Sequence, residues 1–314
     1  MKFTPILLGL SLAAVGASMA AAQDAASTSV PRILQITREY TKPYKGGAAH
    51  DKTESAFITA MNRAKFPAYY VGMNSMSGKA RSLYMTRYSS FGEWEKDNDI
   101  QAKSAALSAD VERASLADGE LLEEVDSGVY TYEEELSFHP HNDIQKHHFY
   151  QVFAFHVRPG HEKEWHELVK MVKDAHEKAG DGAHWGMYSL MFGGEGGTYV
   201  ALTGDPTMSA IDDAFTGRKK YLEALGGEEG MAKADALFGA AVDTSHSELF
   251  AVNPKQSYVS ADWIKEDATF WKPKAEAAPK AQTAAAKPAA APPAQGSMVD
   301  RVRSFFHRLW SRGS

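Results

Sequence analysis

The chain has 314 residues, of which 44% are hydrophobic and 24% charged, and its net charge is −6. This composition excludes collagen-like, wholly disordered and polytopic membrane proteins. The acidic balance argues against a globally basic nucleic-acid binder, so no nucleic-acid partner is expected. The absence of cysteine excludes disulfides, thiolate zinc sites, iron–sulfur clusters and cysteine nucleophiles. At about 100–200 residues per domain, the length allows two domains, or one domain with tails.

Residues 1–22 have the pattern of a secretory signal peptide. Lys2 supplies a positive charge, residues 3–15 are almost wholly apolar, and a run of alanines ending at Ala22 fits a small-residue cleavage site. The apolar run is short and rich in Ala and Gly for a membrane anchor, which is the alternative. We therefore expect an exported protein, periplasmic or secreted, that is cleaved near Ala22.

The C-terminal region predicts a tethered helix. Residues 263–296 are assigned to a linker rich in Ala, Pro and Lys, whose prolines favour an extended spacer. In residues 297–314, apolar side chains recur at helical spacing with arginines on the opposite face. We expect this helix to dock on an anionic membrane surface or in a protein groove, the alternatives being a helix that folds back on its own body or stays disordered. The residues expected to dock are Arg301, Arg303, Phe305, Phe306, Arg308, Trp310 and Arg312.

The body of the chain contains a weak internal repeat. Residues 34–43 align with 150–159, and each segment is a β-rich run that ends in a basic residue and proline. Residues 125–127 align with 242–244, and the matched segments between them keep the same order. Conserved order and spacing across the whole body indicate a duplication. The assigned units are a first repeat at 23–138, a His-rich linker at 139–147 and a second repeat at 148–262.

Each repeat has the element order β-α-β-β-α-β, which is the ferredoxin-like plait. The elements expected after each first strand are helices at 51–65 and 161–179, hairpins at 68–88 and 184–203, helical regions at 91–124 and 208–240, and last strands at 128–138 and 246–258. The glycine-rich run at 193–197 is interpreted as a hairpin turn, and the one at 225–230 as a helix break. Apolar residues on both strand faces suit a sheet with helices on one face and a second sheet on the other.

With this element order, duplication and aromatic strands, the chain resembles the dimeric α/β-barrel superfamily over about residues 31–262. The resemblance implies an α+β fold in which two tandem ferredoxin-like βαββαβ repeats form an intrachain α/β barrel. The superfamily includes cofactor-free monooxygenases, small-ligand or stress-response proteins, and the haem enzymes of the chlorite-dismutase and dye-decolourising-peroxidase groups. The fold alone does not choose among these activities, so whether the chain is an enzyme stays open.

Polar residues on the expected strands are the candidates for a pocket. Arg38 and Tyr40 share one face of the first strand and align with Ala154 and His156. Such groups among aromatic residues could orient a small apolar or aromatic ligand, and a histidine could act as general base. The alternative is that they are solvent-facing or hydrogen-bonded core groups. The candidate ligand-binding residues are Arg38, Tyr40, Tyr70, His156, His184 and Trp185.

Histidine is concentrated in the linker between the repeats. The weak metal candidates there are His139, His141, His147 and His148, since imidazoles ligate zinc, copper or nickel. A solvated linker is the favoured interpretation, and no metal site is predicted. The histidines of HEKEWH are five residues apart, so they diverge on a helix, unlike those of a zincin motif.

No cofactor is predicted, although haem is kept open because the resemblance implies it for some relatives. An axial histidine would come from the second repeat, where the candidates are His156, His166, His176 and His184. The first hypothesis is an exported small-ligand-binding protein with a tethered docking helix. The alternatives are an enzyme, either cofactor-free and monooxygenase-like or haem-dependent, and a non-catalytic interaction protein targeted by its C-terminal helix.

Overall fold

The computed structural model describes residues 30–141 and 143–272. The expected signal peptide, the linker from residue 273 onward and the docking helix lie outside the described residues, and so do its seven docking residues from Arg301 to Arg312. Within the described part of the chain, no helix is long and apolar enough to cross a membrane.

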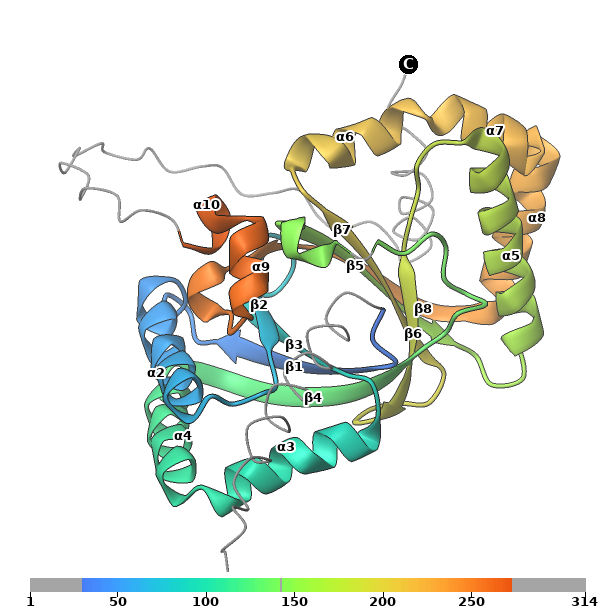
Figure 1. Ribbon diagram of the computed structural model, residues 1–314. Coiled ribbons are helices and arrows are strands. Elements are labelled where there is room, and N and C mark those ends of the chain that lie inside the picture. The colour runs from blue at the N-terminus through green and yellow to red at the C-terminus, as the bar shows by residue number, and fades with distance from the viewer. Residues whose placement is uncertain (1–29, 142, 273–314) are drawn as a thin grey trace, which may run out of the picture.

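Eight antiparallel strands close a barrel in the order β1-β3-β2-β8-β5-β7-β6-β4 (Figure 1). The elements of the first repeat are β1 (Ile33–Thr41), α2 (Ala48–Ala64), β2 (Tyr70–Ser75), β3 (Arg81–Tyr88), α3 (Phe91–Lys103), α4 (Ala105–Gly119) and β4 (Leu122–Tyr132). Those of the second are β5 (Phe149–Val157), α5 (Glu162–Ala179), β6 (Gly186–Phe192), β7 (Thr198–Asp205), α6 (Met208–Thr216), α7 (Arg218–Leu225), α8 (Gly227–Ala241) and β8 (Val242–Val252). A short helix, η1 (Ile144–Lys146), joins them, and η2 (Pro254–Gln256), α9 (Ala261–Glu266) and α10 (Ala268–Trp271) follow β8.

Both repeats contribute a four-stranded sheet with the same strand order, β4-β1-β3-β2 in the first and β8-β5-β7-β6 in the second. The sheets join where β2 pairs with β8 and β4 pairs with β6. β1 and β5 even share an irregularity one residue before their ends, at Tyr40/Thr41 and His156/Val157. The predicted tandem ferredoxin-like repeats and their intrachain barrel are therefore confirmed.

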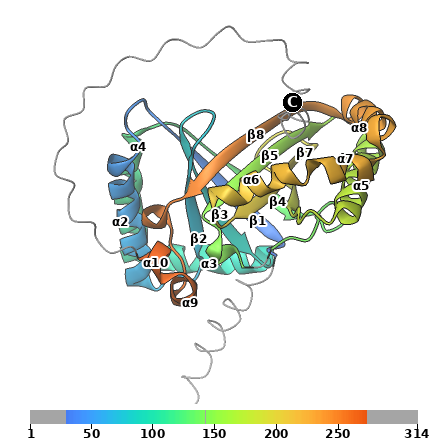
Figure 2. The ribbon, with the colours of Figure 1, turned by 90° about the horizontal axis from the view of Figure 1, so that it is seen from above.

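The helices of the two repeats lie on opposite sides of the barrel, α2 and α4 against the first sheet and α5, α7 and α8 against the second (Figures 1 and 2). Side chains alternate along a strand, so Leu34 and Ile36 of β1 face the barrel interior, whereas Ile33 packs under the helices. On β5, Val152 faces inward and Phe153 faces the helices. The protein thus has three apolar layers, one inside the barrel and one under each helix layer.

The predicted last strands are placed too late. The prediction of 128–138 corresponds to β4 at Leu122–Tyr132, and that of 246–258 to β8 at Val242–Val252. In both strands the first apolar residue is followed by polar residues that a hydrophobic pattern misses, and Glu123 and Glu124 are exposed within β4. The apolar residues beyond β4, such as Leu136, are buried against the second helix layer instead.

Two glycine interpretations are confirmed, while the expected start of the C-terminal linker is wrong. Residues 193–197 form the turn between β6 and β7, and Gly226 ends α7 in a left-handed conformation. Residues 263–272 belong to the folded body, because α9 and α10 bring Trp263 and Trp271, each 7% exposed, into the core inside the barrel.

Candidate functional site

A cavity of about 500 Å³ lies in the second repeat, between the outer face of its sheet and its helices. Two further pockets, of about 160 and 90 Å³, lie at one end of the barrel. The walls of the large cavity are mainly aromatic and aliphatic side chains from both layers. They include Phe153, Phe155, Trp165, Leu168, Val169, Val172, Met187, Ala201 and Phe238.

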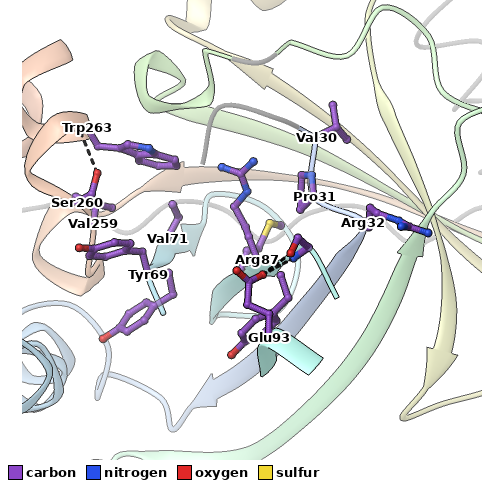
Figure 3. Close-up of a pocket in the computed structure, with 14 residues that line it drawn as sticks. Val30, Pro31, Arg32, Tyr69, Val71, Arg87, Glu93, Val259, Ser260 and Trp263 are labelled. Carbon is purple, nitrogen blue, oxygen red and sulfur yellow. Dashed lines mark hydrogen bonds between the residues drawn. The ribbon is translucent and has the colours of Figure 1, made fainter. Parts of the chain in front are cut away.

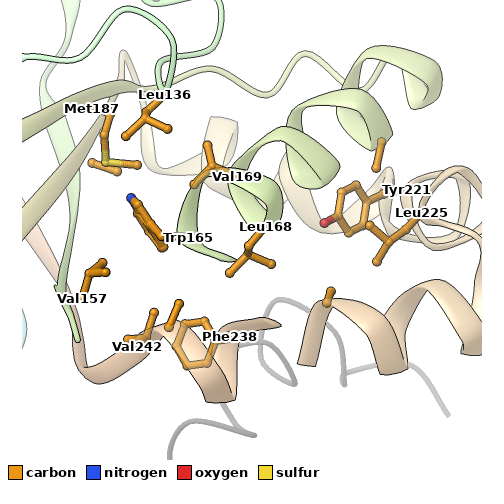
Figure 4. Close-up of a cluster of buried hydrophobic side chains, with 14 residues drawn as sticks. Leu136, Val157, Trp165, Leu168, Val169, Met187, Tyr221, Leu225, Phe238 and Val242 are labelled. Atoms are coloured by element: carbon orange, nitrogen blue, oxygen red, sulfur yellow. The ribbon is translucent and has the colours of Figure 1, made fainter. Parts of the chain in front are cut away.

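The helix wall of this cavity follows from the pattern of α5. Its apolar residues recur at Trp165, Leu168, Val169 and Val172, spaced by three or four residues, and therefore form one stripe along the helix. Figure 4 shows Trp165, Leu168 and Val169 on the side of α5 that carries the buried cluster. The same stripe continues to His176, which places an imidazole at the C-terminal end of an otherwise apolar wall.

His176 is held by a carboxylate. Its Nδ1 lies 2.8 Å from Oδ2 of Asp181, and the other oxygen of Asp181 accepts the backbone N–H of Ala183. Since a carboxylate accepts hydrogen bonds, we assign the Nδ1–H tautomer, which leaves Nε2 as an acceptor. The ring packs against Tyr221 at 4.3 Å and Trp185 at 5.8 Å between centroids. This arrangement is that of an oriented general base or hydrogen-bond acceptor.

Of the six ligand-binding candidates, His184 and Trp185 line the large cavity. Trp185 donates its indole N–H to the carbonyl of Leu136, at 2.8 Å. The two ring nitrogens of His184 lie 3.2 and 3.0 Å from the carbonyls of Gly182 and Gly204. Their polar atoms are thus engaged by backbone, so these two residues shape the cavity wall.

The other candidates lie elsewhere. Tyr70 is on the helix side of the first sheet, where burial raises its pKa above the ordinary value, and it borders the 160 Å³ pocket. Figure 3 shows that pocket, with the Arg87 guanidinium near Trp263. Arg38 forms an ion pair with Asp126.

The remaining two lie at β1 and β5. The Tyr40 ring lies under Lys79, and His156 Nε2 is 3.1 Å from the carbonyl of Gly196. The structure therefore does not bring the six candidates together.

The linker histidines separate into different environments. His139 lies 3.3 Å from Glu177, and His148 lies 2.7 Å from Asp267. His141, Asp143 and His147 converge, with one potential ligand atom from each within 4.8 Å of the others. His147 is only 4% exposed, and burial lowers its pKa to about 4, so the solvated interpretation is wrong for this residue.

A second polar cluster lies under α2 and α4 in the first repeat, where no site was predicted. Its members are Glu39, His50, Glu54 and Asp118. Burial together with the neighbouring Glu39 and Asp118 raises the pKa of Glu54 to about 8. Burial lowers the pKa of His50, but hydrogen bonds to Asp118 and Glu39 outweigh it and raise that pKa to about 10.

Sequence reasoning named His176 only as one of several haem-ligand candidates and missed Asp181 and the first-repeat cluster. A usable signal was present in α5, since a histidine that continues an apolar stripe must enter the core layer. The cluster had no comparable signal, because Glu39 and Asp118 are far apart in the sequence and lie in ordinary polar surroundings there.

No model of a protein family matches the chain, and no curated protein matches it. Among solved structures, it is similar to an anthrone oxidase-like protein, with a TM-score of 0.48 and 12% identity over 74% of this chain and 96% of that one. It is also similar to a proposed monooxygenase from Lactobacillus acidophilus, with a TM-score of 0.44 and 7% identity over 71% and 94%. A third similar structure is a chlorite dismutase from Candidatus Nitrospira defluvii in complex with imidazole, with a TM-score of 0.43 and 7% identity over 77% of this chain and 98% of that one. Matches at this level carry no argument about function, and the fold rests on the strand order described above.

Proposed function

We propose that the protein binds a small aromatic ligand of phenolic type in the second-repeat cavity. The observation that carries the proposal is the apolar cavity of about 500 Å³ with the His176–Asp181 pair in its wall. Ligand pockets in proteins are typically about 300–1,000 Å³, mainly apolar, and fixed by a few polar groups. Export through residues 1–22 and docking through residues 297–314 are separate parts of this proposal.

The polar groups of the cavity support a ligand with one hydroxyl group. Gln151 donates to Asp205 at 3.0 Å, and Thr203 donates to the backbone carbonyl of His184 at 2.9 Å. These two side chains are engaged within the protein, whereas the tautomer of His176 presents Nε2 as an acceptor. A phenolic hydroxyl that donates to Nε2 would place its ring against Trp165 and the phenylalanines of β5.

The enzyme alternative uses the same geometry. A histidine whose Nδ1–H is held by a carboxylate is a suitable general base, because the carboxylate stabilises the imidazolium that forms. In that case His176 would take the hydroxyl proton of the bound phenol and leave a phenolate in the cavity. That proton transfer needs no cofactor.

The cavity does not fit haem. Haem carries two carboxylates, which proteins pair preferentially with arginine or lysine. Among the described residues that line the cavity there is no arginine or lysine, whereas Asp181, Asp205 and Asp213 are present. We therefore derive no step through haem.

The test is binding of a neutral aromatic probe, N-phenyl-1-naphthylamine, to the purified full-length protein, followed by displacement with 2-naphthol and naphthalene. Val172→Trp places an indole in the cavity and should weaken probe binding at least tenfold. Lys170→Trp adds the same indole on the exposed side of α5 and should leave binding unchanged. Unchanged binding in the Val172 variant would show that the cavity is not the site.

Replacing His176 with Gln tests the polar contact. One hydrogen bond to a buried group contributes about 1–1.5 kcal/mol, or about tenfold in affinity. The variant should therefore lose 2-naphthol affinity about tenfold while its affinity for naphthalene, which has no hydroxyl, stays the same. For the enzyme alternative, the naphtholate absorbance of the bound ligand should appear in the parent protein and vanish in this variant. Equal losses for both ligands would contradict recognition of the hydroxyl.

A further inference from the structure

The first-repeat cluster has the composition and spacing of a metal centre. It brings together one imidazole and three carboxylates from three elements, Glu39 on β1, His50 and Glu54 on α2, and Asp118 on α4. Three of the four are almost fully buried, at 1–3% exposed, and the Glu39 side chain is 15% exposed. We propose that this cluster, defined here as the Glu39 centre, binds one divalent first-row transition-metal ion.

The two shorter distances in the cluster fit a shared ion as well as hydrogen bonds. From His50 Nε2, the nearest oxygens of Glu39, Asp118 and Glu54 lie at 3.1, 3.4 and 3.9 Å. Ligand atoms about 2.1 Å from one ion are about 3.0 Å apart at a right angle and about 3.4 Å apart at a tetrahedral angle. Nε2 carries at most one proton and can donate one hydrogen bond at a time, whereas a cation attracts all three oxygens.

Groups outside the Glu39 centre orient its ligands. Ser82 Oγ donates to Asn74 at 2.7 Å and so can accept from Nδ1 of His50, which lies 3.3 Å away. This fixes a hydrogen on Nδ1 and directs Nε2 toward the carboxylates. Thr53 donates to the Asp118 oxygen that faces His50. Metal ligands in proteins are commonly oriented by such supporting hydrogen bonds.

The second repeat provides an internal comparison. By the shared strand length and irregularity, Glu39 corresponds to Phe155 of β5. In the sequence repeat, the segment His50-Asp51-Lys52 matches His161-Glu162-Lys163, and this alignment pairs Glu54 with Trp165. Phe155 and Trp165 pack ring to ring at 5.1 Å between centroids. The plait therefore folds with an apolar pair at this place, so its architecture does not require three carboxylates there. The polar set is therefore specific to the first repeat.

The donor set indicates the class of ion. Imidazole suits zinc, iron, copper and nickel, while carboxylates suit manganese and magnesium. One imidazole with three carboxylates is a mixed set that fits Mn²⁺, Fe²⁺, Co²⁺ or Zn²⁺. In the ligating form the imidazole is neutral and the three carboxylates are ionised, so a divalent ion would leave a net charge of −1 at the site.

The experiment uses the full-length protein, stripped with a chelator and titrated with Mn²⁺, Zn²⁺ and Co²⁺ by calorimetry, with visible absorption for Co²⁺. We expect one ion per chain and cobalt d–d bands. Glu54→Gln, which is isosteric, should weaken binding at least tenfold, and Ser82→Ala should weaken it about tenfold or more with the fold retained. His141→Ala, in the other histidine cluster, is the matched control and should leave the stoichiometry and the bands unchanged.

Three outcomes would overturn the proposal. In the first, the parent chain binds none of the three ions. In the second, both Glu54→Gln and Ser82→Ala bind the ion with full affinity. In the third, the His141 variant no longer binds it. The last would assign the ion to the linker cluster instead. Circular dichroism of each variant shows whether the fold is retained, and Ser82→Ala keeps the test decisive should Glu54→Gln fail to fold.

Discussion

Substitution of Trp263 tests whether α9 and α10 are packed against the barrel as part of one folded body. The Trp263 side chain is 7% exposed and packs in the core inside the barrel, with the Arg87 guanidinium 5.9 Å from the ring centre and Trp271 6.0 Å away. Truncating a buried tryptophan to alanine costs about 3–5 kcal/mol, since apolar contacts are lost and a cavity remains. For a folded body of this size, 1 kcal/mol corresponds to about 2–4 °C in Tm. Trp263→Ala should therefore lower Tm by about 6–20 °C.

The assay is calorimetric thermal unfolding together with urea unfolding at 25 °C. Lys265→Ala is the matched control on the same short helix, because its partner Asp262 is exposed and a surface ion pair contributes less than about 1 kcal/mol. If Trp263→Ala lowers the free energy of unfolding by less than about 1 kcal/mol, Trp263 does not contribute to the core as described. The two helices would then contribute little to the stability of the fold, and the folded body would end near residue 262, the boundary predicted from the sequence for the second repeat.

Two further changes test the burial of single groups. Burial lowers the pKa of His147 from 6.5 to about 4, so the unfolded chain binds more protons between those values, and the stabilisation present above pH 6.5 is lost as the pH falls toward 4. Between pH 7 and 4.5, the free energy of unfolding measured with urea should therefore fall by up to about 3 kcal/mol less in His147→Gln than in the parent protein. An equal fall in both proteins would contradict this. Gly72→Ala should cost about 3 kcal/mol, because a Cβ would lie 2.2 Å from the backbone oxygen of Gln256. Gly119→Ala, which meets nothing within 4 Å in α4, is its control and should be neutral or slightly stabilising in the same unfolding assay.

The fold could be predicted from the sequence because the duplication shows the same order of strands and helices twice. A single βαββαβ pattern is ambiguous, but two copies in register support each other, and the strand order confirms both. Strand ends were less predictable. β4 begins at Leu122 with exposed glutamates, so its pairing with β1 decides its extent rather than its own hydrophobic pattern. The burial of Trp263 and Trp271 depends in the same way on the barrel they close.

The type of residue lining the candidate site could be predicted from the sequence, but its position in the fold could not. A pocket with aromatic walls and a histidine was expected, and His184 and Trp185 do line the cavity. The choice of sheet face was not available from the sequence, because both faces of the strands are apolar. Arg38 and Tyr40 were selected as polar residues on an apolar strand, yet each is held by neighbours near it, Asp126 in one case and Lys79 in the other. Proximity across elements, as between His176 and Asp181, emerges only in the folded chain.

The two repeats use the same layer of the plait for different purposes. Between sheet and helices, the first repeat holds the Glu39 centre, a buried set of four titratable side chains. The second fills the corresponding place with Phe155 and Trp165, and the cavity beside them carries one oriented histidine. Because the barrel interior supplies a shared apolar core to both sheets, either helix layer can depart from simple packing without exposing the other. Duplication followed by divergence of the outer layers thus explains why one fold carries two chemically distinct candidate sites.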